Sequence, residues 1–449
     1  MSFEITDILL EEIKVHVNNE QDATLLELFE DMHHADVAEI LDEVNWDEAV
    51  YLVRLLDSET TSEALMELDE DVRERLLDSL TPKEIAEEVE EMDTDDAVDA
   101  IANLDEEIQE AVIEQIEDEE HKADIRELLQ YDEDSAGGLM AKELIKVKET
   151  WTVAGCVREM RRQAEEVTRV HSIYVISKEN VLLGRLSLKD LLTTSDTKTK
   201  IAEIYIPKVD SVHVDDDGED VAKVMQKYDL EAIPVVDDEN KLLGRITIDD
   251  IVDFIRDEAK EDYQLAAGIT QEVEADDSII QLTRARLPWL FLGLIGGVGA
   301  ATIMGGFEDI LKEYALLFFY TPLIAAMAGN VGVQSSAIIV QGLANDDVKG
   351  SISNRLLKEM LLAALNGLIL GIVLFGFTAV WYGDFKAAMA ISISLFVVII
   401  MAGIIGTFIP LFLDKRGIDP AIATGPFITT SNDIFGILIY FWIAKLILF

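Results

Sequence analysis

The pattern of hydrophobic and polar positions changes once along this chain, near residue 287. Beyond that point the sequence contains five predominantly apolar runs, at residues 287–307, 314–344, 360–383, 387–413 and 420–444. Each run is long enough to cross about 30 Å of hydrocarbon as a helix, because a helix rises about 1.5 Å per residue. We therefore predict an α-helical membrane domain of five spans over residues 284–449.

Before residue 131 the apolar positions recur at helical spacing in short segments. The pairs Asp36-Val37, Asp71-Val72 and Glu107-Ile108 recur with a period near 35, and each is followed by Leu or Ile at helical spacing. A repeat of this kind predicts stacked helix pairs. Residues 1–130 are therefore expected to form an all-α superhelical N-domain.

A second repeat has a period of 60, because residues 179–190 return as residues 239–250 with the same Leu-Leu-Gly-Arg segment. Each copy follows an apolar strand-like run, at 172–176 and 232–236, and leads into a helix. The unit resembles a tandem pair of CBS domains, modules that combine strands and helices into a flat regulatory disc. An α/β tandem pair is expected over residues 131–250.

The resemblance to CBS domains carries a candidate nucleotide site. In that family a Ser/Thr-x-x-Asp motif at the helix start can hold the ribose of an adenosine nucleotide, and Ser187 with Asp190 and Thr247 with Asp250 match it. ATP is then the expected modulator. The same spacing fits helix N-caps, in which the hydroxyl bonds to the backbone of the first turn. Of the two interpretations we favour capping.

Residues 251–283 lie between the repeats and the first span and are expected to form one connecting helix. The stretch is acidic and is the only covalent route from the cytosolic part to the membrane. A helix at this place can transmit motion or block the inner mouth of a pore.

Charge is distributed as unevenly as hydrophobicity. The net charge is −52 although 49% of the residues are hydrophobic, and residues 1–286 hold 78 acidic against 28 basic side chains. Such a region repels nucleic acid and anionic lipid head groups and attracts cations. Solvating charge and adaptation to a saline habitat are alternative explanations. Cys156 is the only cysteine, which excludes disulfides within the chain.

The basic residues around the spans predict their orientation. One side carries Arg284, Arg286, Lys349, Arg355, Lys358, Lys415 and Arg416, and the other carries Lys312, Lys386 and Lys445. The positive-inside rule places residues 1–286 in the cytoplasm and the C-terminus outside. The membrane is expected to be a bacterial cytoplasmic membrane. The acidic N-terminus does not have the features of a secretory signal.

Asp433 is the one carboxylate well inside an apolar run. A carboxylate there costs several kcal/mol unless it faces a wet cavity or a partner. Thr429 and Pro426 share its helical face, and Gly425-Pro426 is expected to loosen the backbone one to two turns earlier. A bound hydrated cation is the economical explanation, and a protonated Asp between helices is the alternative.

The second run adds neutral oxygens. Pro322 and residues 329–334 place small and amide residues in an apolar helix, with Asn330 and Gln334 on one face. Helix packing alone would explain the glycines. Oxygen ligands without thiolate or imidazole suit Mg²⁺ or Ca²⁺. A single carboxylate is too little to dehydrate Mg²⁺, so the pore is expected to recognise a largely hydrated ion, with symmetry doubling the carboxylates.

The order of these parts resembles the MgtE family of magnesium channels. The most specific matches are residues 131–140, Pro322 with residues 329–334, and Asp419-Pro420-Ala421 followed by Gly425-Pro426 and Asp433. The resemblance implies a homodimer in the lipid bilayer, with the pore between the two membrane domains, that imports Mg²⁺ and is closed by cytosolic Mg²⁺.

The resemblance also implies regulatory Mg²⁺ ligands. On matching positions these are Asp217, Glu219 and Asp229 in the second CBS repeat, Asp250, Asp253, Glu258, Glu261 and Asp262 on the connecting helix, Glu63, Asp95 and Asp99 in the N-domain, and Asp419 at the inner end of the fifth span. Asp95 and Asp99 are four apart on one predicted helix, so they can face one ion together.

Other functions remain as alternatives. A membrane-anchored, nucleotide-binding CBS regulator that conducts nothing has no use for an unpaired intramembrane Asp, and a CBS-bearing chloride channel would need anion sites. Transport of Mn²⁺ or Co²⁺ fits the same ligands. An enzyme is least expected, because no HExxH spacing, phosphate loop or nucleophile elbow is present.

Overall fold

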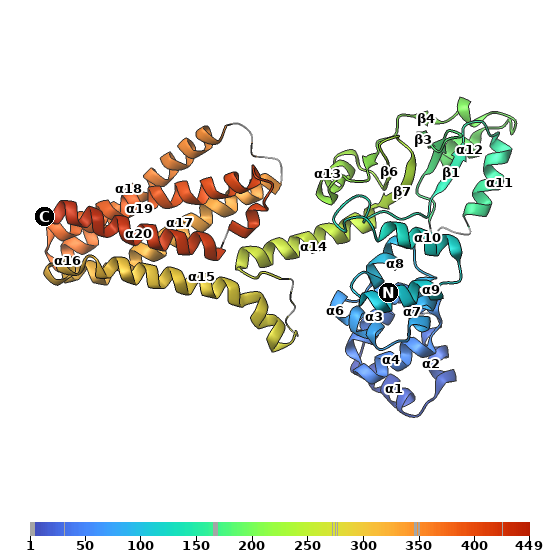
Figure 1. Ribbon diagram of the computed structural model, residues 1–449, viewed down its shortest axis with the longest axis horizontal. Coiled ribbons are helices and arrows are strands. Elements are labelled where there is room, and N and C mark those ends of the chain that lie inside the picture. Colours follow the sequence, from blue (N-terminus) through green and yellow to red (C-terminus); the bar gives the residue numbers. More distant parts are fainter. Residues whose placement is uncertain are drawn as a thin grey trace. The chain divides into compact units, whose positions relative to one another are not determined.

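The computed structural model describes residues 5–30, 32–164, 169–271, 273, 275, 277–344, 348, 351–423 and 425–449. The chain folds into two compact units, Met1–Ile255 and Arg256–Phe449. The first unit contains short helices and strands, and the second contains long apolar helices (Figure 1).

Short helices form the N-terminal part of the first unit. They are α1 (Asp7–Asn18), α2 (Asp22–Phe29), α3 (His34–Glu43), α4 (Trp46–Leu55), α5 (Ser58–Met66), α6 (Glu70–Asp78), α7 (Pro82–Val89), α8 (Thr94–Ile101), α9 (Glu106–Gln115) and α10 (Glu119–Leu128). From α3 to α9 the helices begin at residues 34, 46, 58, 70, 82, 94 and 106, one every 12 residues. Alternate helices pack together, α3 on α5, α5 on α7 and α7 on α9.

This arrangement confirms the predicted helical N-domain and corrects its repeat. The predicted period near 35 is wrong, because it spans three successive helices. The repeating unit is a pair of helices, since α3, α5, α7 and α9 begin at residues 34, 58, 82 and 106. A pattern that returns at every helix also returns at every third one, so the longer spacing was visible in the sequence without being the structural unit.

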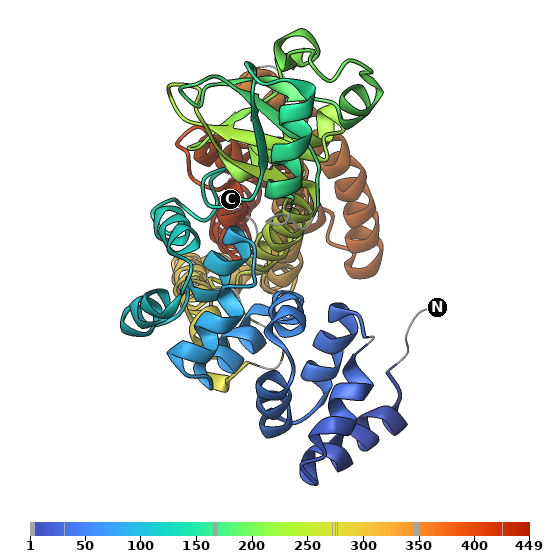
Figure 2. The same cartoon turned by 90° about the vertical axis from the view of Figure 1, so that its right-hand side faces the viewer.

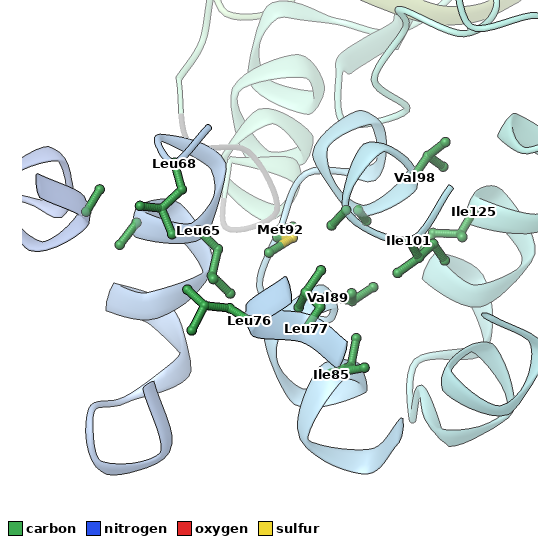
Figure 3. Packing of buried hydrophobic residues seen from close by; sticks show 14 of the residues in the cluster. Leu65, Leu68, Leu76, Leu77, Ile85, Val89, Met92, Val98, Ile101 and Ile125 are labelled. Atoms are coloured by element: carbon green, nitrogen blue, oxygen red, sulfur yellow. The ribbon is translucent and has the colours of Figure 1, made fainter. Parts of the chain in front are cut away.

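Aliphatic side chains from successive helices form one core in this part (Figure 3). Leu65, Leu77 and Ile101 are completely buried. The turns between the helices are fixed by caps such as Thr81, which receives the backbone N–H of Glu84 while the Glu84 carboxylate accepts the N–H of Thr81. A capped turn and 8–10 helical residues fill each 12-residue step, which leaves only one face of each helix for the core.

The strands form two sheets in the green part of the ribbon (Figure 2). They are β1 (Ile145–Lys148), β2 (Ile173–Ile176), β3 (Leu182–Leu186) and β4 (Ile206–Pro207), then β5 (Val212–His213), β6 (Ala232–Val236) and β7 (Leu242–Thr247), with α11 (Val153–Gln163), α12 (Leu188–Thr193), η1 (Ile201–Glu203) and α13 (Gly218–Tyr228) between them. The orders are β1-β2-β3-β4 and β5-β6-β7. In each sheet the first pair is parallel and the second antiparallel.

The two sheets bind each other reciprocally at matching turns. The N–H of Leu182 donates to the carbonyl of Asn240 at 2.9 Å, and the N–H of Leu242 donates to the carbonyl of Asn180 at 3.0 Å. Asn180 and Asn240 both have positive φ, 66° and 58°. This local symmetry confirms the predicted tandem α/β repeat.

The connecting segment differs from the single helix predicted over 251–283. Helix α14 spans Ile248–Ala267 and ends at Gly268, whose φ of +82° is the left-handed conformation that terminates helices. Beyond the glycine, the N–H and the hydroxyl of Thr270 both donate hydrogen bonds to the carbonyl of Ala285, at 3.0 Å each. The glycine therefore separates α14 from the first membrane helix.

The second unit is a bundle of α15 (Ile279–Gly305), α17 (Ala315–Ala344), α18 (Ile352–Tyr382), α19 (Phe385–Asp414) and α20 (Gly425–Leu448), with the short α16 (Glu308–Glu313) and η2 (Pro420–Ala423) in its connections. Within the described residues these five long helices are long and apolar enough to cross a membrane. The predicted five spans are confirmed. The fifth begins at Gly425 rather than 420, because residues 420–423 form a separate turn capped by Asp419, whose carboxylate accepts the N–H of Ala421 at 2.8 Å.

Glycines allow close approach inside the bundle. A Cβ on Gly406 of α19 would lie 2.4 Å from the carbonyl oxygen of Gly332 on α17, and one on Gly436 of α20 would lie 3.1 Å from the Cβ of Ala328. Helices without such positions could not approach so closely. The packing of α17 against α19 and α20 sets the geometry of the candidate ion site.

Candidate ion sites

A polar hollow of about 370 Å³ opens between α17 and α20 in the membrane domain. It is lined by Ala325, Ala326, Gly329, Asn330, Val333, Gln334, Thr429 and Asp433. The structure thus brings together Asn330, Thr429 and Asp433, which the sequence singled out on two separate runs.

The local sequence explains why Asp433 faces this hollow. Thr429 lies one turn before it on α20, and its hydroxyl donates to the carbonyl of Gly425 at 2.8 Å. On α17 a Cβ at Gly329 would lie 3.1 Å from the Cγ2 of Thr429 and 3.8 Å from a carboxylate oxygen of Asp433. The expected loosening at Gly425-Pro426 is not what the structure has, because these residues lie at the start of α20 rather than inside it.

The hollow is open on the side away from the bundle. Asn330 and Gln334 are exposed, and Asp433 is half-buried. Among the described residues, the basic side chains form no ion pair with Asp433. An uncompensated carboxylate beside two exposed amides, on apolar helices, is suited to a hydrated cation.

The residue beside Asp433 is a polar group that sequence reasoning missed. Asn432 is completely buried, and within the described part of the chain neither its amide nitrogen nor its amide oxygen has a hydrogen-bond partner. It packs on Gly332 of α17. An Asn next to an Asp in an apolar run was the available signal, but only the helix packing shows which of the two faces the hollow.

A second group of carboxylates lies at the start of α8, in the first unit. Oxygens of Asp93, Asp95 and Glu143 lie within 4.8 Å of one another. Glu143 caps the helix, because its carboxylate accepts the N–H of Thr94 at 3.2 Å and the Thr94 hydroxyl at 2.9 Å. The structure therefore adds Asp93 and Glu143, which the sequence did not single out because Glu143 reaches α8 across 49 residues.

Burial and mutual repulsion make these carboxylates hard to ionise. Burial raises the pKa of Asp93 to about 6, of Asp96 to about 7 and of Asp99 to about 6. Burial together with the neighbouring charge of Asp96 holds the pKa of Asp95 well above its ordinary value. The cluster needs protons or a cation to stay together, and oxygen-only donors suit Mg²⁺ or Ca²⁺.

The other predicted regulatory residues lie in several places. Asp95 groups with Asp93 and Glu143 rather than with Asp99. Glu63 contacts the ring of His34 on α3. Asp217 caps α13, Glu219 pairs with Lys223, Asp229 ends α13 with a φ of +50°, and Asp253, Glu258, Glu261 and Asp262 lie along α14.

The two candidate nucleotide motifs differ from each other. Ser187 stands before α12 but its side chain makes no capping bond. The Thr247 hydroxyl donates to the carboxylate of Asp250 at 2.6 Å, and this carboxylate also accepts the N–H of Thr247. Asp190 lies in the first turn of α12. The favoured capping interpretation is thus wrong for the Ser187 side chain, while at the second motif it is Asp250 that reaches back to the helix start.

Comparison with known proteins decides the family. Over 324 residues the chain is 38% identical to the magnesium transporter MgtE of Enterococcus faecalis, which covers 72% of this chain and 71% of that protein. This chain belongs to the MgtE family of magnesium transporters. MgtE proteins of Thermus thermophilus and Bacillus subtilis are 36% and 35% identical, over 73% and 71% of this chain and equal shares of their own.

Family models and a solved structure agree with this assignment. The model described as divalent cation transporter matches residues 321–443, the MgtE intracellular N domain matches 32–134, and the CBS domain matches 136–196 and 201–257. The cytosolic domain of the Mg²⁺ channel MgtE, solved in complex with ATP, is 33% identical with a TM-score of 0.51, and the match covers 55% of this chain and 99% of that one. The predicted resemblance to MgtE is confirmed, and the chain is a multi-pass membrane protein.

Proposed function

We propose that this member of the MgtE family is a Mg²⁺ channel that imports Mg²⁺ across the bacterial cytoplasmic membrane, with Asp433 in its pore. The observation that carries the proposal is the hollow between α17 and α20, where Asp433 lies beside Asn330 and Thr429. Neutral oxygens and one carboxylate can hold a hydrated divalent cation by hydrogen bonds to its water shell, without removing that shell.

The exposed side of the hollow favours a homodimer. Asn330 and Gln334 are exposed amides on a predominantly apolar helix. Facing lipid they would lose hydrogen bonds to water, so a second copy that completes a polar pore is the economical arrangement. Two Asp433 carboxylates would then face one ion. The positive-inside pattern supports a cytosolic N-terminus and an external C-terminus.

Cytosolic Mg²⁺ is proposed to close the pore. The regulatory Mg²⁺ ions would be bound by carboxylates. These are the carboxylates near α8, including Asp95, Asp99 and Asp250, the acidic residues along α14, and Glu63, Asp217, Glu219, Asp229 and Asp419. Without Mg²⁺ these groups repel one another, and with it they are bridged. Many weak sites of this kind can bias one two-state equilibrium.

A contact inside the second unit gives closure a physical route. A Cβ at Gly425, the first residue of α20, would lie 2.1 Å from the carbonyl oxygen of Ala266 on α14, and a Cβ at Gly268 would lie 2.3 Å from Cγ of Pro426. The end of α14 therefore touches the start of the helix that carries Asp433. A displacement of α14 would therefore displace the start of α20, the helix that carries Asp433.

ATP is proposed as a modulator that binds between the CBS repeats. The Ser187 hydroxyl makes no capping bond and Asp190 lies one turn on, so both remain suited to a ribose, with Thr247 and Asp250 as the second pair. Calorimetry with ATP on the purified chain in Mg²⁺-free buffer, comparing wild type with Asp190→Ala, tests this. The absence of any difference would leave the motif without a ligand role.

The transport proposal is tested by Mg²⁺ flux into proteoliposomes. Wild type should conduct Mg²⁺ at low internal Mg²⁺ and less at millimolar internal Mg²⁺, and Mn²⁺, Co²⁺ and Ca²⁺ should be measured in the same way. Asp433→Asn should abolish flux, while Asp414→Asn, an exposed carboxylate at the end of α19, serves as control. If well-folded wild-type protein carries no divalent cation, the chain is a regulator rather than a transporter.

A further inference from the structure

The repeated Leu-Leu-Gly-Arg segment places two arginines in equivalent positions with opposite surroundings. Arg185 on β3 is exposed, whereas Arg245 on β7 is 5% exposed. A buried guanidinium is costly unless it is paired and hydrogen-bonded. The second repeat therefore retains a buried charge that the first repeat does without.

Arg245 is held in place by its backbone and directed at one carboxylate. Its N–H and carbonyl pair with Ala141 at 2.9 and 2.8 Å. Its Nη2 lies 3.4 Å from a carboxylate oxygen of Asp93. Within the described residues its Nε has no hydrogen-bond partner. The guanidinium is thus only partly satisfied within the described residues: its ion pair with Asp93 is long, and it also attracts the carboxylate of Asp250.

The partner of Arg245 belongs to the carboxylate cluster at α8. Asp93, Asp95 and Glu143 bring their oxygens within 4.8 Å of one another, close enough to share one ion. A cation bound there would take the same carboxylate that Arg245 faces. The two oxygens of Asp93 could contact both, but its single negative charge would then be shared between a guanidinium and a divalent cation that repel each other.

We infer that Arg245 is an internal counter-cation that competes with regulatory Mg²⁺ for the carboxylate of Asp93, and so sets the Mg²⁺ concentration at which the first unit becomes ordered. The inference rests on the closure by Mg²⁺ proposed above. Without Mg²⁺, Arg245 offsets part of the repulsion in the cluster. When Mg²⁺ binds, the buried guanidinium has to share the charge of Asp93 with a second cation close by, and their repulsion weakens the binding of Mg²⁺.

The sign of the effect follows from this competition. Removing the arginine charge removes the competitor, so the cluster should bind Mg²⁺ more tightly, although the Mg²⁺-free protein should be less stable. Removing a cluster carboxylate should have the opposite effect on binding. A merely structural arginine would lower stability by the same amount with and without Mg²⁺.

The experiment is a Mg²⁺ titration of protease protection on the full chain in detergent. Arg245→Met should lower the midpoint about fivefold or more, a coupling typical of linked sites. Glu143→Gln should raise it. Arg185→Met, the equivalent exposed arginine, should titrate like wild type. If Arg245→Met does not fold, Arg245→Gln serves, because its amide is polar but uncharged and too short to replace the ion pair with Asp93.

A double-mutant cycle shows whether Arg245 acts through Asp93. In an Asp93→Asn background, Arg245→Met should shift the midpoint by less than half as much in logarithmic terms. If wild type is protected by Mg²⁺ but the Arg245 variants have an unchanged or raised Mg²⁺ midpoint, the role of Arg245 is wrong while the proposed closure by Mg²⁺ stands. If wild type itself shows no protection by Mg²⁺, the proposed closure fails, and the inference falls with it.

Discussion

The two carboxylate sites of this chain differ in number and surroundings. Asp433 is a single carboxylate in a membrane helix, in an open hollow with neutral oxygens. At α8 several carboxylates crowd together, with Arg245 and Thr94 as partners. No neighbouring carboxylate can replace Asp433, so removing its charge should abolish ion binding at the hollow. At α8 several carboxylates contribute to binding the same ion, so removing one of them should have a small effect and removing several a large one.

The largest expected effect is therefore at the lone site. Asp433→Ala should lower Mg²⁺ flux in proteoliposomes by at least about 100-fold, because about 3 kcal/mol of favourable interaction with the ion is lost with the carboxylate that lines the hollow. The protein should keep its oligomeric state on gel filtration. Full complementation of a Mg²⁺-dependent growth defect by this variant would remove Asp433 from the pore.

The crowded site should show the opposite behaviour. Changing Asp95, Asp96, Asp99 and Asp250 together to Asn should raise the Mg²⁺ concentration that closes the channel about tenfold, whereas Asp99→Asn alone should raise it about twofold, because many small biases add in one equilibrium. Single-channel recording at graded internal Mg²⁺ measures both.

A matched control removes the same charge elsewhere. Glu11, Glu27, Glu39 and Glu43 are exposed on the N-terminal helices, and changing all four to Gln should leave closure unchanged. If this control shifts closure as much as the cluster variant does, bulk negative charge rather than the geometry at α8 is responsible.

The neutral oxygens beside Asp433 should matter less than the charge. Asn330→Ala and Thr429→Val should each lower flux about threefold to tenfold, because each removes one hydrogen bond to the hydration shell of the ion, worth about 1 kcal/mol. Thr429→Ser retains the hydroxyl and should conduct like wild type. Loss in the Ser variant but not in the Val variant, which keeps the Cγ2 methyl, would mean that Thr429 acts by packing on Gly329 instead.

The comparison also shows how far sequence reasoning reached. Features with a strong local signal, the five apolar runs and the 60-residue repeat, gave the right elements. The helical period was misjudged because every third helix matched as well as every second one. Gly268 was not recognised as the end of α14, since only the structure shows its positive φ. Glu143 and Arg245 join the cluster only through contacts across 49 and 152 residues, which spacing along the chain cannot reveal.

The smallest expected effect on transport concerns a third kind of carboxylate, one that is lone and buried but has a hydroxyl partner. Glu88 on α7 accepts the Thr61 hydroxyl at 2.5 Å, and burial raises its pKa to about 7. Unlike the half-exposed Asp433 it is 6% exposed and bonded to a hydroxyl, so we expect it to hold a proton rather than a cation. Because its pKa is raised in the folded state, its contribution to stability is complete below about pH 4.5 and is lost as the pH rises through about 7.

In Mg²⁺-free buffer the N-domain should therefore lose on the order of 2 kcal/mol of stability between pH 5 and pH 8 through this group, measured by pulse proteolysis of the full chain in urea. Glu88→Gln should reduce the total pH dependence by that amount, leaving the part that comes from the α8 carboxylates, and should leave Mg²⁺ flux unchanged, while Glu91→Gln, an exposed neighbour, should retain the wild-type dependence. A pH dependence of equal size in Glu88→Gln would assign the effect to the α8 cluster instead.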